Sequence, residues 1–119
     1  MKFTAIHAEL KIPILFLAAI SANDKHRKPA TGMFDFVESV MGCKVDQAKS
    51  FYCGDAAGRP ATKAAKKDFS ADDLKFAWNV GLRFETPESF FLGLPQTGVQ
   101  QRLFQPKQNY SSETAQPKP

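Results

Sequence analysis

Two residues of this 119-residue chain have side chains suited to handling a phosphate group. Asp55 follows Gly54 and stands among small residues, and a carboxylate in such a loop can hold a Mg²⁺ ion. Lys28 ends the basic run 25–28 and supplies a positively charged ammonium. A metal-binding carboxylate beside an ammonium is what phosphoryl transfer requires, because both offset the negative charge of the phosphate.

Each residue also has an ordinary structural explanation. Aspartate is common in turns, and a loop rich in lysine and arginine is usually a solvated surface. Taken together, the two residues favour a phosphate site, because each is expected just beyond the carboxyl end of a strand. Ligands bind at that edge of an open parallel sheet. We therefore expect Lys28 and Asp55 to face the same edge.

Three strands and three helices are expected to position these residues. Their order, strand, helix, strand, helix, strand, helix, predicts an α/β fold with a mainly parallel sheet. The strands are expected over residues 12–20, 49–53 and 82–84. The helices are expected over residues 31–42, ending at Gly42, over 71–79 after a capping box of Ser70 and Asp73, and from Thr86-Pro87-Glu88 onward.

The apolar run 12–20 has two interpretations. Its length and composition fit a buried strand of a parallel sheet. With Lys2 before it and small residues after it, the run also resembles a secretory signal peptide, which would make this a secreted protein. Glu9 and Lys11, directly before the run, favour the strand.

Length and composition fit one small globular unit. Apolar residues make up 43% of the chain, and 16 basic residues exceed 12 acidic ones, for a net charge of +4. This excess favours acidic or phosphorylated partners. No stretch reaches the roughly 18–20 apolar residues of a membrane span, so no membrane partner is expected. Cys43 and Cys53 are expected to be buried reduced thiols, with no disulfide-linked partner.

The small number of strands predicts an incomplete domain. A doubly wound sheet usually needs about five strands or more to cover both faces. We therefore divide the chain into an N-terminal lead-in over 1–11, half of an α/β domain over 12–95, and a polar segment over 96–119. The composition of the last segment is typical of a disordered tail or a linker.

Four successive segments resemble the polynucleotide kinase 3′-phosphatase family. They are His26-Arg27-Lys28-Pro29-Ala30-Thr31-Gly32-Met33-Phe34, Gly54-Asp55-Ala56-Ala57-Gly58-Arg59-Pro60, Lys66-Lys67-Asp68-Phe69-Ser70 with Asp73, Phe76, Ala77, Asn79 and Gly81, and Thr86-Pro87-Glu88-Ser89-Phe90-Phe91. The resemblance covers roughly residues 12–105. The four segments occur in order with compatible spacing, which makes the resemblance far more specific than any one of them.

The resemblance implies a haloacid-dehalogenase (HAD)-like, Rossmann-like fold, of which this chain holds the C-terminal part. It implies Mg²⁺-dependent removal of 3′-phosphates from DNA ends in nuclear strand-break repair, through an aspartyl-phosphate, with DNA-repair proteins as partners. Lys28 then corresponds to the phosphate-stabilising lysine, and Arg27 and Arg59 to contacts of the substrate phosphate. Asp55 corresponds to a Mg²⁺ ligand and Asp68 to the second acid of the same motif, whereas Ser70 and Asp73 are assigned to the helix cap.

The sequence departs from the family pattern in the residues that start the reaction. The 119 residues contain no DxDxT, the motif that supplies nucleophile and acid/base, and no GxxxxGK[ST] phosphate loop of a kinase. Without a nucleophile, this chain alone is expected to be inactive as a phosphatase. The alternative is a non-enzymatic remnant that binds nucleic-acid phosphates through Arg27, Lys28, Arg59, Lys63, Lys66 and Lys67.

Overall fold

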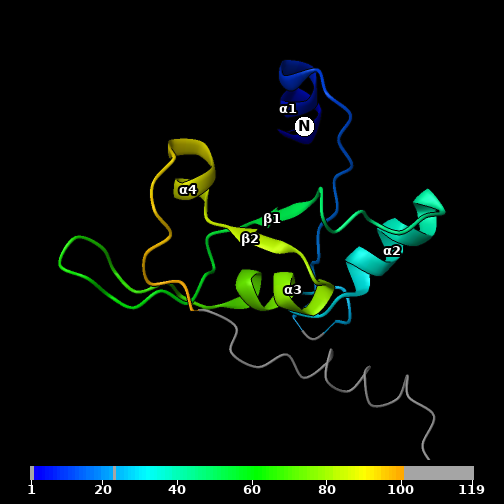
Figure 1. The fold of residues 1–119 in the computed structure, drawn as a ribbon. Helices are drawn as coiled ribbons and strands as arrows, with labels where there is room; N and C mark the ends of the chain where they lie inside the picture. Colours follow the sequence, from blue (N-terminus) through cyan, green and yellow to red (C-terminus); the bar gives the residue numbers. More distant parts are fainter. Residues whose placement is uncertain (1, 23, 101–119) are drawn as a thin grey trace, which may run out of the picture.

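The computed structural model describes residues 2–22 and 24–100, which form a small α/β unit (Figure 1). The elements in chain order are α1 (Lys2–Leu10), α2 (Gly32–Met41), β1 (Phe51–Cys53), α3 (Asp72–Val80), β2 (Arg83–Glu85) and α4 (Pro87–Leu92). β1 and β2 pair in parallel, with Phe51 opposite Arg83 and Cys53 opposite Glu85. The α/β class and the parallel pairing are confirmed, with two strands in the described residues instead of three.

Helices α3 and α4 pack on opposite faces of the sheet (Figure 1). Successive side chains of a strand point to opposite faces. Accordingly, the Tyr52 ring lies 4.9 Å from Phe76 of α3, and the Phe51 ring lies 4.7 Å from Phe90 of α4. The buried apolar residues gather on the α3 side: Ala56, Ala57, Leu74, Phe76, Ala77 and Val80. The core therefore lies between β1, α3 and the loop that follows β1.

The ends of α2 and α4 follow the local sequence. α2 ends at Gly42, whose φ of 70° is the left-handed conformation that commonly closes a helix. At the start of α4, the Thr86 hydroxyl accepts from the Ser89 amide at 3.1 Å, and the Ser89 hydroxyl accepts from the Thr86 amide at 3.0 Å. The predicted helices at these positions are confirmed.

The predicted capping box of Ser70 and Asp73 is wrong. α3 follows Ala71, which caps the helix without a side-chain hydrogen bond, and Asp73 is only 5% exposed. The Asp73 carboxylate accepts hydrogen bonds from groups outside its own helix, including Lys28. A buried carboxylate is stabilised far more by an ammonium than by a local amide, so a tertiary contact overrides the local motif.

The predicted strand over residues 12–20 is also wrong. The segment has no regular secondary structure, and four of its large apolar side chains are 40–96% exposed: Ile12, Leu15, Leu17 and Ile20. A strand is stabilised by ladder hydrogen bonds to a neighbouring strand. β1 and β2 pair with each other, and the described residues offer no third strand to pair with this segment. The lead-in over 1–11 contains α1, a helix that the sequence did not predict.

The cysteines and the polar segment agree only in part with the sequence predictions. Both cysteines are free, but Cys43 is exposed just past the end of α2 and Cys53 is half-buried, so the prediction that both are buried is wrong. Residues 96–100 have no regular structure, and the rest of the predicted tail, 101–119, lies outside the described residues. In the part of the chain that the structure describes, no helix is both long and apolar enough to cross a membrane.

Candidate functional site

The loop that carries Asp55 begins where the two strands end. The Gly54 amide donates to the Glu85 carbonyl at 3.1 Å, which extends the parallel pairing one residue beyond β1. Asp55 comes next and is exposed, while Ala56 and Ala57 behind it are buried. Asp55 therefore lies at the carboxyl edge of the sheet, on a loop whose next two residues are fixed in the core.

Lys28 lies in a cluster with Asp73 and Tyr52. Its Nζ donates to Asp73 Oδ1 at 2.5 Å and to the Tyr52 hydroxyl at 2.9 Å. The Tyr52 hydroxyl in turn donates to Asp73 Oδ1 at 3.2 Å. An ammonium has three N–H donors, and these contacts use two of them. The Lys28 side chain is 36% exposed, so it is held by these contacts and still partly accessible from solvent.

Asp73 connects Lys28 to the Asp55 loop. Its second oxygen, Oδ2, accepts from the Ala56 amide at 3.0 Å, directly after Asp55 in the chain. A Cβ atom added at Gly54 would collide with the same carboxyl group, so glycine at this position allows the close approach. One buried carboxylate thus bridges the ammonium and the loop that sequence analysis placed at the same edge.

The charges of this cluster reinforce one another. Burial disfavours the charged form of Lys28, but hydrogen bonds to Asp73 and Tyr52 outweigh it and raise the pKa of Lys28. Burial likewise opposes the charge of Asp73, but Lys28 and the Ala56 amide lower the pKa of its carboxyl group. Burial raises the pKa of Tyr52. At neutral pH the cluster therefore contains an ammonium, a carboxylate and a neutral phenol.

A second contact from α3 holds the Lys28 loop. The Asn79 side-chain amide, one helix turn and a half beyond Asp73, donates to the Pro29 carbonyl at 2.9 Å. The loop is also closed on itself, because the Gly32 amide donates to the Lys25 carbonyl at 2.9 Å. Lys28 is thus positioned both by its own ammonium and by the backbone next to it.

Arg59 and Asp68, two further site residues predicted from the resemblance, bind each other. Arg59 Nε and Nη2 donate to the two carboxylate oxygens of Asp68 at 2.8 and 3.1 Å, and Nη1 donates to Glu88 at 3.1 Å. Hydrogen bonding to Asp68 raises the pKa of Arg59, and the same bonds lower the pKa of the Asp68 carboxyl group. The structure therefore places Arg59 in an ion pair between the loop and α4.

The described residues fit Mg²⁺ at Asp55 and not at Asp68. Mg²⁺ keeps several waters and is commonly bound by one or two carboxylates together with phosphate oxygens. Asp55 is exposed at the carboxyl edge and suits one such ligand, whereas both oxygens of Asp68 are engaged by Arg59. Among the described residues, no group of three or more His, Cys, Asp or Glu side chains is arranged to hold a metal ion. Arg27 is exposed and has no acidic partner within the same residues.

Sequence analysis did not identify Asp73 and Tyr52 as the hydrogen-bond partners of Lys28. Asp73, Ala77 and Val80 are spaced four and three residues apart and form one buried face of α3. An acid on the apolar face of a helix signals a buried, paired charge. That pattern could have identified Asp73, but its partner Lys28 lies 45 residues away and could not be deduced from spacing.

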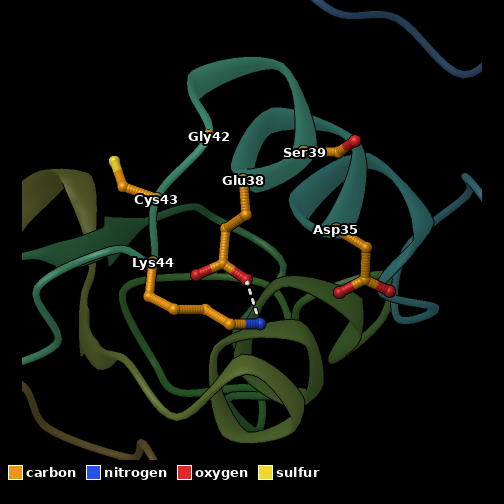
Figure 2. A pocket seen from close by; sticks show the side chains of 6 residues that line it. All are labelled: Asp35, Glu38, Ser39, Gly42, Cys43 and Lys44. Atoms are coloured by element: carbon orange, nitrogen blue, oxygen red, sulfur yellow. Dashed lines mark ion pairs between the residues drawn. The ribbon is translucent and has the colours of Figure 1, made fainter.

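A hollow at the end of α2 is separate from this cluster. Its volume is about 450 Å³, and Figure 2 shows Asp35, Glu38 and Lys44 among its lining residues. The two carboxylates are engaged locally: Glu38 binds Lys44 at 3.6 Å and the Val45 amide at 2.7 Å, and Asp35 accepts from the Thr31 hydroxyl. The Glu38 contacts stabilise the turn that follows α2, and the Asp35 contact lies in the first turn of the helix.

Known proteins match most of the chain. The family model described as polynucleotide kinase 3 phosphatase matches residues 1–91. A bifunctional polynucleotide phosphatase/kinase of Schizosaccharomyces pombe is 44% identical over 110 residues, which are 92% of this chain and 25% of that protein. A polynucleotide 3′-phosphatase of Arabidopsis thaliana is 44% identical over 72 residues, 59% of this chain and 10% of that protein.

A third relative extends the agreement. A polynucleotide 3′-phosphatase of Saccharomyces cerevisiae is 42% identical over 79 residues, 59% of this chain and 31% of that protein. The chain therefore spans between a tenth and about a third of the length of these three curated relatives.

Proposed function

Because the chain belongs to the polynucleotide kinase 3 phosphatase family, we propose that it forms the phosphate-binding part of a polynucleotide 3′-phosphatase. The proposed substrate is the 3′-phosphate of a damaged DNA end, and the proposed fold of the whole domain is HAD-like. Nuclear localisation and association with DNA-repair proteins belong to the same proposal. The names of the relatives support the substrate class, since they are polynucleotide phosphatases.

The geometry of Lys28 carries the proposal. Its ammonium is oriented by Asp73 and Tyr52, retains one donor, and is 36% exposed. A preorganised ammonium can stabilise a phosphoryl group without reorganising as charge develops in the transition state. Since Asp73 also binds the amide after Asp55, a phosphate that contacts Lys28 would lie close to the carboxyl edge of the sheet.

Asp55 would contribute to binding Mg²⁺ in this proposal. A bound Mg²⁺ polarises a phosphoryl oxygen and offsets its charge. Asp55 supplies an exposed carboxylate at the carboxyl edge, and Ala56 and Ala57 fix its backbone in the core. Arg27, exposed in the Lys28 loop, is the proposed contact for a neighbouring phosphate of the strand. Arg59 is engaged by Asp68 and Glu88, so its proposed role shifts from binding phosphate to shaping the loop.

The nucleophile has to come from a DxDxT motif, which the 119 residues do not contain. In the proposed reaction one aspartate of that motif attacks the phosphorus, and the bond to the 3′-oxygen breaks as the motif's acid/base aspartate gives that oxygen a proton. The same acid/base then takes a proton from water, which hydrolyses the aspartyl-phosphate and releases inorganic phosphate and the free nucleophile. Lys28 and Asp55 assist both steps but cannot start them. We therefore expect the 119-residue chain to bind 3′-phosphorylated ends without releasing phosphate.

Binding and turnover test these two statements separately. Fluorescence anisotropy of 3′-phosphorylated and 3′-hydroxyl oligonucleotides should show a preference for the phosphate that Lys28→Ala removes. Lys75→Ala, an exposed lysine on α3, is the matched control and should keep the preference. Equal binding of both ends by the unaltered chain would overturn the phosphate-binding role. Phosphate release by this chain with Mg²⁺ would overturn its predicted inactivity.

The upstream reading frame offers a second test. If it encodes DxDxT, the longer chain should release phosphate from a 3′-phosphorylated DNA end in a Mg²⁺-dependent reaction. Lys28→Ala should then lower kcat by about 10²–10³-fold, the usual effect of removing a preorganised charge donor. A longer chain with DxDxT and no phosphatase activity would contradict the proposed function.

A further inference from the structure

The loop 60–67 projects from the body of the protein on a base made by Arg59 and Asp68 (Figure 1, green). The backbone amide of each residue donates to the other residue: the Asp68 amide to the Arg59 carbonyl at 3.0 Å, and the Arg59 amide to the side-chain oxygen Asp68 Oδ2 at 2.9 Å. The side-chain ion pair described above joins them again. The base of the loop is therefore closed by four hydrogen bonds between two residues.

The tip of the loop is ordered as well. The Thr62 hydroxyl accepts from the Ala64 and Ala65 amides at 3.2 and 3.0 Å, and the Thr62 amide donates to the Ala65 carbonyl at 2.8 Å. Such side-chain-to-backbone bonds stabilise a tight turn. The loop is thus preorganised at both ends, so a ligand that binds it has less conformational entropy to remove.

This loop is one of two strongly basic segments of the chain, the other being the run 25–28. Residues 60–67 contain Lys63, Lys66 and Lys67 and no acid, which gives +3 within eight residues of a chain whose net charge is +4. All three lysines are exposed, and none forms an ion pair within residues 2–22 and 24–100. Arg59, a fourth basic residue nearby, forms ion pairs with Asp68 and Glu88. Its charge therefore stabilises the loop, whereas the charges of the three lysines are available to a ligand.

The location of the loop relates it to the candidate site. Arg59 Nη2 also donates to the Asp55 carbonyl at 3.4 Å, so the base of the loop adjoins the residue proposed to bind Mg²⁺. Ala64 and Ala65 stand between Lys63 and Lys66, and their small side chains let a bulky ligand approach the loop backbone. A single phosphate is bound by groups that converge on one point. Three ammoniums spread along a projecting loop instead match a polymer with regularly spaced negative charges.

We propose that loop 60–67 binds the sugar-phosphate backbone of the polynucleotide whose 3′ end occupies the site, with Lys63, Lys66 and Lys67 as its contacts. This inference rests on the proposed function for the identity of the polymer. The loop recognises charge spacing and not bases, because lysine ammoniums contact phosphates without reading sequence. The loop therefore supplies affinity and register, and Lys28 supplies recognition of the terminal phosphate.

The test compares two triple variants of the full chain. The loop variant carries Lys63→Ala, Lys66→Ala and Lys67→Ala. The control carries Lys11→Ala, Lys49→Ala and Lys75→Ala; these three lysines are also exposed, and their replacement lowers the net charge by the same amount. Binding of a 3′-hydroxyl single-stranded 15-mer is measured from 50 to 300 mM salt, and far-UV circular dichroism checks that each variant is folded.

The loop variant should bind the 15-mer about tenfold more weakly or worse at 50 mM salt, and the slope of log K against log salt should fall by about 2. The control should change the slope by less than one. Equal losses in the two variants would overturn the proposal, as would failure of the unaltered chain to bind the 15-mer at low salt. The affinity for thymidine 3′-monophosphate, measured by competition, should be unchanged in the loop variant. If this affinity fell as much as the affinity for the 15-mer, the assignment of the loop to the sugar-phosphate backbone would be overturned.

The 3′-hydroxyl probe separates this inference from the proposed function. It lacks the terminal phosphate, so its dependence on the loop does not involve Lys28 recognition. If the loop variant loses binding while 3′-phosphorylated and 3′-hydroxyl strands bind the unaltered chain equally, the loop proposal stands and the phosphatase role fails. If the 3′-phosphate is preferred but both triple variants bind alike, the loop proposal fails alone.

Discussion

Lys28 Nζ lies 2.5 Å from Asp73 Oδ1, and this contact joins residues 45 positions apart in the sequence. Asp73 is buried and also accepts from Tyr52 and from the Ala56 amide, so a single carboxylate organises the Lys28 loop, β1 and the Asp55 loop. Removal of a buried acceptor leaves its donors unsatisfied, which costs more than the loss of one surface ion pair. We therefore expect the stability of this protein and the geometry of its proposed phosphate site to depend on the same residue.

Replacement of Asp73 should be much more costly than replacement of its neighbour. We expect Asp73→Ala to lower the free energy of unfolding by about 2–4 kcal/mol, because an ammonium, a phenol and an amide lose their acceptor. Asp72→Ala, in the same first turn of α3, should cost about 0.5–1 kcal/mol through the helix dipole. Urea unfolding followed by circular dichroism measures both. Equal costs would contradict the central role of Asp73.

The lowered pKa of Asp73 predicts an acid-dependent stability. A carboxyl group whose pKa is lower in the folded state stabilises above its ordinary pKa of 3.8, and loses that contribution as the pH falls through the folded value. The raised pKa of Lys28 has the opposite sense: its contribution is complete below 10.5 and is lost as the pH rises through the folded value. The pair should thus contribute constantly between about pH 5 and 9.

Urea unfolding from pH 2.5 to 8 distinguishes the contribution of Asp73 to the pH dependence from the contributions of other carboxyl groups. The free energy of unfolding should fall below about pH 4 in the unaltered chain and fall less steeply in Asp73→Asn. Some dependence should remain, because the pKa values of other carboxyl groups are also lowered: Asp24, Asp68, Glu85 and Glu88. Identical pH profiles of the two proteins would show that Asp73 is not linked to folding.

Gly54→Ala should act through Asp73. The new Cβ would overlap the Asp73 carboxyl group, and we expect a loss of about 1–3 kcal/mol in the free energy of unfolding, as for other overpacked sites. Gly42→Ala meets no atom within 4 Å and should cost only the left-handed backbone strain, about 1–2 kcal/mol. In the double variant Gly54→Ala/Asp73→Ala, the loss in the free energy of unfolding should be smaller than the sum of the two single losses, since the colliding group is then absent. In Gly42→Ala/Asp73→Ala the two losses should add.

The ion pair of Arg59 should protect the basic loop from proteolysis. Trypsin cleaves after lysine, and Lys63, Lys66 and Lys67 are exposed on a loop held closed by Arg59 and Asp68. Arg59→Gln should raise the rate of cleavage at these lysines about tenfold, if closure contributes roughly 1.4 kcal/mol to loop order. Arg83→Gln removes an exposed arginine whose contacts are with Glu85 and the Phe51 ring and not with this loop, and it should leave the rate unchanged. Mass spectrometry of the fragments at early times gives both rates.

Much of the local structure was predictable from short stretches of residues. Gly42 ends α2 and Thr86 starts α4 as expected, because a left-handed backbone and a helix cap depend on a few adjacent residues. The alternation of helices and strands predicted the α/β class and the parallel pair. The four family segments predicted the polynucleotide phosphatase family, since they preserve residue types at exact spacing.

Long-range contacts decided what the side chains do. Local sequence rules predicted that Asp73 would belong to a helix cap. Its carboxylate instead binds an ammonium that folding brings to it, because a buried charge is stabilised most by a charged partner. Arg59 and Asp68, assigned separately to phosphate and metal, meet across the loop and bind each other. Residues 12–20 have the composition of a strand, but a strand exists only where another strand completes its hydrogen bonds, and the described chain provides none for them.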